Sequence, residues 1–344
     1  MAGKWKRRLL KGVGYGAGVL VLLLAVGITV TVGWRPFIGP KSRALTERRF
    51  EATPGRLARG KYLAESVTGC MACHTKLDRR DLPGSYASAK KGGGASMEGE
   101  GSDAWLVAPN ITPDVETGVG GWTDDQLARA IREGVSPEGR ALFPAMPYGG
   151  YRHMSDEDLA SVVVYLRSVE AVRNPLPETK IPFPLSRLIN TAPEPLSAPV
   201  PEPDRSNPVK YGEYLVRVSD CAGCHTPRGG TGQAVEGLEY GGGNVFDDGR
   251  GHTVATANLT PDPTGISYYD EALFVEAIRT GHVKARKLDD AMPWWAFRDM
   301  TDEDLKAMFA YLRTLKPASH RVDNTEPPTP CKVCKQKHGL GDRN

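Results

Sequence analysis

An uncharged, largely apolar run extends from Gly12 to Trp34, directly after a basic stretch near the start of the chain. A membrane-spanning helix needs roughly 20 apolar residues, and this run is long enough to be one. A cleaved signal peptide is the alternative, but its apolar region is usually about 7–15 residues long and ends at a small-residue cleavage site, which does not stand out here. We therefore predict a basic stub and a transmembrane anchor over residues 1-34.

Beyond the anchor, the chain contains two versions of one unit, at residues 56-168 and 208-315. The segment GKYLAESVTGCMACHT returns as GEYLVRVSDCAGCHTP, NITPDVETG returns as NLTPDPTG, and AMPYGGYRHMSDEDL returns as AMPWWAFRDMTDEDL, in the same order. Each unit has a size that is reasonable for one domain. The repeat predicts two tandem domains, at residues 50-170 and 208-318.

Proline is dense between the two units, which predicts an extended linker without a core of its own at residues 171-207. Residues 319-344 form a C-terminal tail with a pair of cysteines.

Apolar residues recur with helical periodicity at matching places of the two units. Ser155 and Thr301 are candidate N-caps, and acidic residues follow each of them. Apolar side chains then recur at i, i+3, i+4 and i+7. They are Leu159, Val162, Val163 and Leu166 in the first unit and Leu305, Met308, Phe309 and Leu312 in the second.

A second helix is predicted from Thr123 to Gly134, with a counterpart that ends at Gly281, and a third candidate precedes each cysteine motif. No segment alternates strongly enough to predict a sheet. The fold class is therefore mainly α, with long loops that suit the 39 glycines and 27 prolines.

The formal net charge of +3 is small, and the basic residues are scattered rather than gathered into one stripe with aromatics. Such a distribution argues against a nucleic-acid partner.

The pentapeptide C-x-x-C-H occurs twice, once in each unit, as Cys70-Met-Ala-Cys73-His74 and Cys221-Ala-Gly-Cys224-His225. This pattern is typical of covalent haem c attachment, because both thiols reach the vinyl groups of one porphyrin while the adjacent imidazole points at the iron. A thioredoxin-like redox pair would need a βαβ context, and a zinc site would need further Cys or His ligands. The duplication predicts two covalently bound haem c groups, with His74 and His225 as iron ligands.

Met146 and Met292 are the candidate sixth ligands, because both stand in Ala-Met-Pro, about 70 residues after their histidine. A thioether suits haem iron, and His/Met ligation raises the reduction potential. Met154 and Met300 also align with each other, and their place before a helix cap predicts core packing instead. Met71 and Met97 have no counterpart in the other unit.

The sequence resembles the class I cytochrome c family, and more narrowly the multihaem cytochrome c subunits of membrane-bound bacterial alcohol, gluconate and sugar dehydrogenases. The resemblance rests on PNITPDVETGVGGWTDDQLARAIREGVSPEGRALFPAMPYGGYRHMSDEDL and extends over both units and the linker segment IPFPLSRL. It implies two class I cytochrome c domains that pass electrons from a dehydrogenase towards quinone or a terminal oxidase. Those subunits typically carry three haems, whereas C-x-x-C-H occurs only twice here.

Cys331-Lys-Val-Cys334 in the tail has the thiol spacing without the following histidine, and His338 is displaced. A third haem is therefore not expected. We predict a disulfide, with a surface cysteine pair in a metal or partner contact as the alternative. The histidines without a match in the other unit are predicted to lie on the surface or in loops; they are His153, His252, His282 and His320.

The sequence thus predicts an electron-transfer protein rather than an enzyme: a membrane-anchored dihaem c-type cytochrome that carries single electrons. Its redox partners would be dehydrogenase subunits or a quinol-oxidising complex, and a terminal oxidase as acceptor. The alternative is a dihaem enzyme, a peroxidase or a thiosulfate dehydrogenase-like protein, with one labile haem ligand.

Haem attachment by thioethers takes place outside the bacterial cytoplasm, which predicts residues 35-344 on the periplasmic side of the inner membrane. The basic residues before the anchor agree with this orientation by the positive-inside rule. Further basic residues soon after the anchor, such as Arg35 and Lys41, weaken that charge signal.

Overall fold

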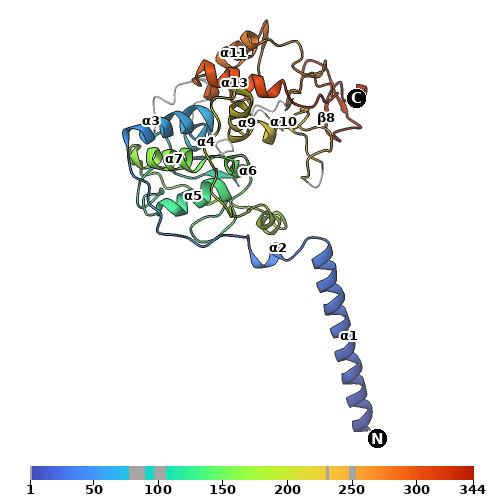
Figure 1. Cartoon of the computed structure of the whole chain (residues 1–344). Coiled ribbons are helices and arrows are strands. Elements are labelled where there is room, and N and C mark those ends of the chain that lie inside the picture. Colours follow the sequence, from blue (N-terminus) through green and yellow to red (C-terminus); the bar gives the residue numbers. More distant parts are fainter. Residues whose placement is uncertain (1, 77–89, 97–105, 230–231, 248–252) are drawn as a thin grey trace.

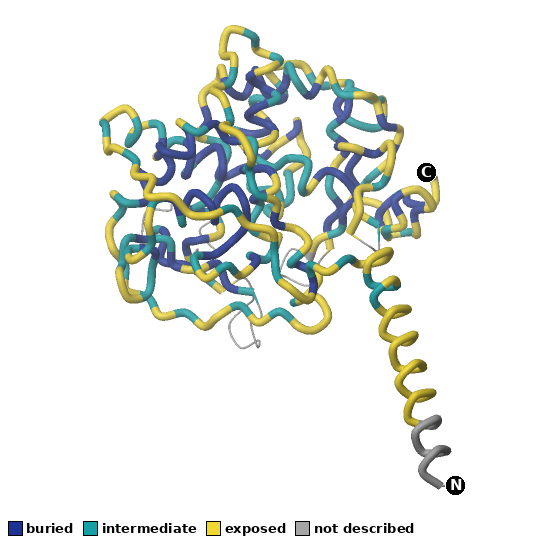
Figure 2. The backbone as a smooth tube through the Cα atoms, turned by 60° about the horizontal axis from the view of Figure 1, so that its bottom comes forward, coloured by how far each residue is buried: buried dark blue, intermediate teal, exposed yellow. Residues whose placement is uncertain are grey.

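The computed structural model describes residues 2–76, 90–96, 106–229, 232–247 and 253–344. It shows two mainly helical units and one long helix that projects away from them (Figure 1). That helix, α1 (Ala2–Val30), is exposed along most of its described side chains (Figure 2). Within the described residues it is the one helix long and apolar enough to cross a membrane, a test that a signal sequence near the N-terminus also passes.

The first unit is built on helices α3, α4, α5, α6 and α7, with a π-helical turn η1 between α3 and α4. Their bounds are α3 Pro54–Tyr62, η1 Leu63–Val67, α4 Cys70–His74, α5 Asp124–Glu133, α6 Tyr148–Tyr151 and α7 Asp156–Ser168. The second unit repeats this order, with α9 Pro208–Val218, α10 Cys221–His225, α11 Glu271–Thr280, α12 Trp294–Phe297 and α13 Asp302–Leu312. Short helices also flank the units: α2 Arg35–Ile38, α8 Leu185–Leu188, η3 Ile189–Thr191 and η4 Gly341–Arg343.

The helix ends lie where the sequence predicts them. Thr123 forms a capping box with Gln126 at the start of α5, and Ser155 and Thr301 cap α7 and α13. Gly134 and Gly281 end α5 and α11 with left-handed backbone, at φ of 68° and 70°, a conformation in which glycine has no steric penalty.

In each unit the first helix crosses the last one at close range. A Cβ atom added to Gly60 of α3 would overlap the backbone carbonyl of Ser161 in α7, and one added to Gly212 of α9 would overlap that of Ala307 in α13. Glycine at these two positions therefore lets the helix backbones touch. Apolar side chains of these helices and of η1 fill the core on either side of the crossings; they include Leu63, Leu159, Val163, Leu215, Leu305 and Leu312.

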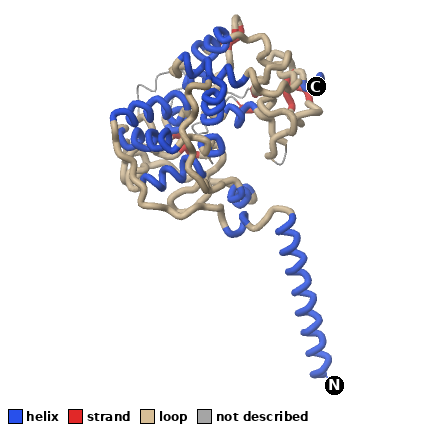
Figure 3. Tube along the Cα trace, viewed as in Figure 1, coloured by secondary structure: helices blue, strands red, loops and turns tan. Residues whose placement is uncertain are grey.

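The expectation of no sheet is wrong in detail, because the described residues contain four antiparallel two-stranded ladders (Figure 3). Their strands are β1 Ala95–Ser96, β2 Val107–Ala108, β3 Val245–Asp247, β4 Thr253–Ala255, β5 His282–Val283, β6 Arg286–Lys287, β7 Pro328–Pro330 and β8 Lys337–Gly339. Each strand has only two or three residues, which is too short for an alternating pattern to be recognisable.

Arg43 attaches the chain that follows α2 to the first unit. Its guanidinium lies 2.7 Å from both carboxylate oxygens of Asp125 and 2.7 Å from Oε1 of Glu133, at the two ends of α5. Asp125 and Glu133 are buried. The ion pairs therefore connect the segment next to α1 to the folded unit.

In both units, a short segment after the last helix is held by an equivalent asparagine side chain. We call these segments the straps; they are residues 172–174 and 318–320. The side-chain amide of Asn110 donates to the carbonyl of Val172 over 2.6 Å, and that of Asn258 donates to the carbonyl of Ala318 over 2.7 Å. Both asparagines are buried, and each also accepts from the backbone N–H two residues on, as a turn residue does. The predicted turn segments thus also anchor the straps.

The two units meet through a reciprocal contact between equivalent residues. The hydroxyl of Tyr62 in α3 donates to Asp304 over 2.6 Å and accepts from the backbone N–H of Thr301 at 3.0 Å. In the opposite direction, the hydroxyl of Tyr214 donates to Asp158 over 2.6 Å and accepts from the N–H of Ser155 at 3.2 Å. Each unit therefore binds the N-terminus of the other unit's last helix.

We expect the double variant Tyr62→Phe, Tyr214→Phe to weaken the association of the two units. Each substitution removes a hydrogen bond to a charged group, worth about 1.5–3 kcal/mol, without altering the core of its own unit. Scanning calorimetry should show one unfolding transition in the parent protein and two separated transitions in the variant. Tyr268→Phe, at a side chain that is 54% exposed, is the control. A single, unshifted transition in the double variant would contradict the role of this contact.

Candidate functional site

Each C-x-x-C-H motif forms one short helix, α4 in the first unit and α10 in the second. Both helices follow a left-handed residue, Gly69 with φ of 61° and Asp220 with φ of 53°, so the chain turns sharply before the first cysteine. Residues at i, i+3 and i+4 lie on one face of a helix. The two thiols and the imidazole of each motif therefore share a face.

The motif histidines are buried and held by backbone carbonyls. Nδ1 of His74 lies 2.7 Å from the carbonyl oxygen of Pro109, and Nδ1 of His225 lies 2.7 Å from that of Ala257. A carbonyl only accepts, so Nδ1 donates and Nε2 is left as a lone-pair donor for a metal. Burial lowers the pKa of both histidines, which keeps the imidazoles neutral, as metal ligands must be.

Cys70 and Cys221, the first cysteines of the two motifs, are free thiols that pack against the hydrophobic core. Burial raises the pKa of Cys70 to about 11 and that of Cys221 to about 12. A redox pair of the thioredoxin kind depends on a thiol with a lowered pKa, so this alternative loses support. Uncharged thioethers, in contrast, fit such an environment.

A zinc site at these motifs also loses support. Within the described residues, the group of three or more His, Cys or carboxylate side chains that lie close enough to share one ion is in the C-terminal tail and includes neither motif. The residues of α4 and α10 thus fit haem c better than either alternative.

Met146 and Met292 occupy equivalent turns immediately before α6 and α12. The carbonyl of Met146 accepts from the N–H of Tyr148 at 2.8 Å, and that of Met292 accepts from the N–H of Trp294 at 2.7 Å. Both side chains are partly buried and pack against the hydrophobic core. Their role as iron ligands stays a prediction.

The competing methionines lie inside the core, as predicted. Met154 and Met300 are each 1% exposed, and Met71 is fully buried. Met97 lies outside the described residues.

The two attachment helices lie at the contact between the units. A Cβ atom on Gly150, in α6, would lie 2.9 Å from Oδ1 of Asp220, which precedes α10. At the equivalent place, a Cβ atom on Gly69, which precedes α4, would lie 3.9 Å from Cβ of Ala296 in α12. Each motif therefore faces the segment that follows the candidate methionine of the other unit.

The pKa of one motif cysteine also indicates that the two motifs lie close together. The pKa of Cys224 is raised to about 11, mainly by burial and further by the nearby charges of Asp220 and Cys73, which belongs to the other motif. Apart from the small residues at equivalent positions, nothing in the sequence indicates this arrangement.

Asp220 is a functional candidate that the sequence did not reveal. Burial raises the pKa of this carboxyl group to about 6, in spite of a favourable charge on Arg228. The carboxylate in turn raises the pKa of Cys221 and Cys224. A group that titrates near neutral pH thus lies directly beside the second motif.

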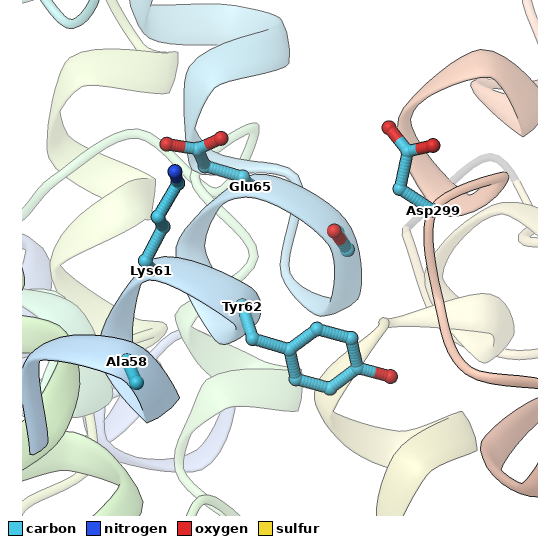
Figure 4. A pocket seen from close by; sticks show the side chains of 6 residues that line it. Ala58, Lys61, Tyr62, Glu65 and Asp299 are labelled. Atoms are coloured by element: carbon cyan, nitrogen blue, oxygen red, sulfur yellow. The ribbon is translucent and has the colours of Figure 1, made fainter. Parts of the chain in front are cut away.

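A pocket of about 300 Å³ opens where the first unit faces the second (Figure 4). It is lined by Ala58, Lys61, Tyr62, Glu65, Ser66 and Asp299. None of the predicted site residues lines it, and we assign no role to it.

The prediction of a disulfide in the tail is wrong. The structure has Cys331 and Cys334 as free thiols, not as a disulfide, and both are buried rather than on the surface. His320 lies in a loop, which is one of the two predicted settings for the unmatched histidines, but it is completely buried, because the second strap carries it into the interior. His153 is half-buried and His282 is exposed, whereas His252 lies outside the described residues.

Comparison with known proteins identifies the family of each unit. A family model described as cytochrome C oxidase, cbb3-type, subunit III matches the chain twice, at residues 55–166 and 207–312. The two matches coincide with the two units of the repeat.

Curated relatives cover much of the chain. It is 29% identical over 272 residues to the fructose dehydrogenase cytochrome subunit of Gluconobacter japonicus, which covers 75% of this chain and 52% of the relative. The cytochrome c subunit of the quinone-dependent alcohol dehydrogenase of Gluconobacter oxydans is 28% identical over 281 residues, covering 77% of this chain and 56% of the relative. A diheme cytochrome c-type protein of Cereibacter sphaeroides is 29% identical over 269 residues, covering 77% of this chain and 87% of the relative. The chain thus spans about half of the length of several relatives.

Proposed function

Since the chain belongs to the cytochrome c family described as cytochrome C oxidase, cbb3-type, subunit III, we propose that it is a membrane-anchored, two-haem c-type cytochrome that carries single electrons. The observation that carries this proposal is the pair of equivalent C-x-x-C-H helices, each with a buried histidine oriented by a backbone carbonyl. The protein would act as an electron carrier, and as a subunit or partner of an oxidoreductase rather than as a catalyst.

The residues of each unit have distinct roles in holding the cofactor. The thiol pairs Cys70/Cys73 and Cys221/Cys224 would attach one haem c each, and the axial ligands would be His74 with Met146 and His225 with Met292. When bound, haem c supplies reversible one-electron exchange at its iron. The carbonyls of Pro109 and Ala257 fix the imidazoles, and the apolar core excludes water from one side of the site.

The contact between the units supports a relay. Because each attachment helix packs against the other unit, the two cofactors would be held at a fixed and short separation. The reciprocal tyrosine hydrogen bonds support a fixed arrangement of the two units.

The partners are proposed from the relatives' names and from α1. Cytochrome subunits of dehydrogenases are among the relatives, so a dehydrogenase or a quinol-oxidising complex would supply the electrons, and an acceptor such as a terminal oxidase would receive them. α1 would hold residues 35-344 at the periplasmic face of the bacterial inner membrane. Thioether attachment outside the cytoplasm supports that side.

The proposal is tested on the purified full-length protein by haem quantification and by optical and near-infrared spectra. We expect two haems per chain, both low-spin and both with the sulfur-to-iron charge-transfer band. Carbon monoxide binding to one reduced haem, or a high-spin fraction, would contradict the simple relay and favour a dihaem enzyme with a labile ligand.

Asp220 predicts a pH dependence of the reduction potential of the second haem. Below a pH of about 6 the carboxyl group is protonated, and above it a negative charge beside Cys221 stabilises the oxidised iron. The potential should therefore fall on going from about pH 5 to about pH 7.5, by some tens of millivolts, because the interaction between two unit charges is modest at an effective dielectric constant of ~20 and is reduced further by screening. Potentiometric titration at several pH values measures this.

Asp220→Asn should flatten the pH profile of the second haem. Glu236→Gln, a substitution at an exposed acidic residue of the same unit, is the control. An unchanged pH profile in Asp220→Asn would refute the assignment.

A further inference from the structure

Four potential metal ligands gather in the C-terminal tail, away from both cysteine motifs. They are His320, Cys331, Cys334 and His338, and one donor atom from each lies within 4.8 Å of all the others. All four side chains are buried, with exposed fractions of 0%, 4%, 0% and 2% in that order. Two thiols and two imidazoles thus share one interior position.

The imidazoles are oriented for a common ion. Nε2 of His320 lies 3.5 Å from Sγ of Cys331, and Nε2 of His338 lies 3.3 Å from Sγ of Cys334. The other ring nitrogens are engaged: Nδ1 of His320 lies 2.9 Å from the carbonyl of Gly241, and Nδ1 of His338 lies 3.0 Å from that of Gly339. A metal-bound histidine almost always donates its second N–H to such a partner.

The backbone of the tail brings three of these ligands together by itself. β7 and β8 pair so that Thr329 faces His338, and the connecting turn carries both cysteines. Within that turn the N–H of Cys334 points to Sγ of Cys331 at 3.5 Å, a contact that stabilises a thiolate. The fourth ligand, His320, comes from the second strap.

The surroundings leave little space beside the cluster. A Cβ atom on Gly243, whose φ is 93°, would lie 2.5 Å from Cε1 of His320 and 3.5 Å from Sγ of Cys334. Glycine at this position therefore lets the chain pass directly against the ligands.

The first unit supplies an internal comparison, because Asn174 occupies the place of His320. The backbone N–H of Asn174 donates to Thr117 Oγ1 at 2.9 Å, and that of His320 donates to Thr264 Oγ1 at 3.0 Å. The Asn174 side chain donates to the carbonyl of Gly93 over 2.7 Å, as His320 does to Gly241. An asparagine thus suffices to hold the strap, and only the Nε2 atom of His320 has no equivalent.

We propose that His320, Cys331, Cys334 and His338 bind one Zn²⁺ ion as a closed tetrahedral structural site. Two thiolates and two imidazoles form the Cys₂His₂ set typical of structural zinc, and a bound cation deprotonates its thiols outright. The site joins the terminal hairpin to the loop after α10, where Gly242 N–H donates to the carbonyl of His225 over 2.7 Å. The proposal does not depend on the redox role of the protein.

Metal analysis of the full-length protein, purified without chelator, is the first test. We expect one zinc per chain. X-ray absorption at the zinc edge, which haem iron does not obscure, should show two sulfur ligands at about 2.3 Å and two nitrogen ligands at about 2.0 Å. No metal at the site, or a different metal with another ligand set, would overturn the proposal.

The variant His320→Asn tests the assignment of ligands with the residue that the first unit uses. It preserves a side-chain donor for the Gly241 carbonyl but removes the ligand nitrogen, so zinc content after dialysis against a weak chelator should fall at least roughly tenfold, because incomplete ligand sets bind weakly. Cys334→Ser should have the same effect, and His282→Ala, at an exposed histidine, should have none. Zinc that stays in both ligand variants would overturn the site.

A thiol count on the unmodified chain separates zinc from a disulfide without any variant. This count rests on the proposed function, in which the other four cysteines are blocked as haem thioethers and Cys331 and Cys334 remain as reactive groups. Denaturation with chelator should release two thiols per chain that are protected in the native protein. No reactive thiol before reduction, and two after it, would mean a Cys331–Cys334 disulfide and refute the zinc site.

Discussion

Replacing Met146 or Met292 by alanine should remove half of the sulfur-to-iron charge-transfer band and lower the reduction potential of the affected haem. The loss follows because a water or a nitrogen ligand stabilises oxidised iron better than a thioether does. We expect a decrease on the order of 100–300 mV, within the ~0.8 V range over which axial ligands set haem potentials. Near-infrared spectra and a potentiometric titration of each single variant measure the two effects separately.

The matched controls are Met154→Leu and Met300→Leu, at the aligned methionines of the core. Leucine has a similar volume, so each variant should cost less than about 1.5 kcal/mol of stability and leave both spectra and potentials unchanged. If instead a core variant loses the band while Met146→Ala or Met292→Ala keeps it, the ligand assignment is reversed.

The double variant Cys221→Ser, Cys224→Ser should contain one haem instead of two. Without thioethers the second unit cannot retain its cofactor, whereas the first unit has its own pair at Cys70 and Cys73. The intact mass of the denatured protein should fall by one haem, and haem staining of a denaturing gel should halve. The second unit should also lose stability, because the buried imidazole of His225 would lack the iron that we propose it binds.

The tail offers the control for this experiment. Cys331→Ser, Cys334→Ser alters a C-x-x-C pair with the same spacing but without the following histidine. It should retain both haems. A loss of haem from this variant would mean that the tail carries a third attachment site and that the count of two is wrong.

Most of the helical framework could be predicted because its signals are local. The caps at Thr123, Ser155 and Thr301 and the ends at Gly134 and Gly281 depend on residues within one turn. The short strands could not be predicted, because the formation of a strand of two or three residues depends on its partner strand and not on the alternation of its own residues.

The contact between the units could not be predicted for a different reason. Asp158 and Asp304 have an adequate local explanation as acidic residues at a helix N-terminus. Their hydrogen bonds to Tyr214 and Tyr62 join residues 56 and 242 positions apart, and no single-sequence pattern reports such a pairing. Only the duplication of both tyrosines and both aspartates gave an indication.

The tail was misinterpreted because two cysteines at this spacing are compatible with several roles. A disulfide is a sufficient explanation as long as His320 is treated as a residue on the surface. The burial of that histidine depends on the strap, which Asn258 holds from 60 positions before Ala318. Two features of the sequence could have indicated a metal site in the tail. They are the pattern C-x-x-C-x-x-x-H and the histidine at the position where the first unit has Asn174.

The straps also have a consequence for where each unit ends. Sequence similarity between the halves fades near residues 168 and 315, yet the hydrogen bonds of Asn110 and Asn258 reach residues 172 and 318, and those of Thr117 and Thr264 reach residues 174 and 320. In the first unit these residues are the start of the predicted linker. The beginning of the linker is therefore also a structural part of the first unit. A first domain produced alone should therefore extend beyond Asn174, and a second one beyond His320, because shorter fragments would leave a buried asparagine amide without its acceptor.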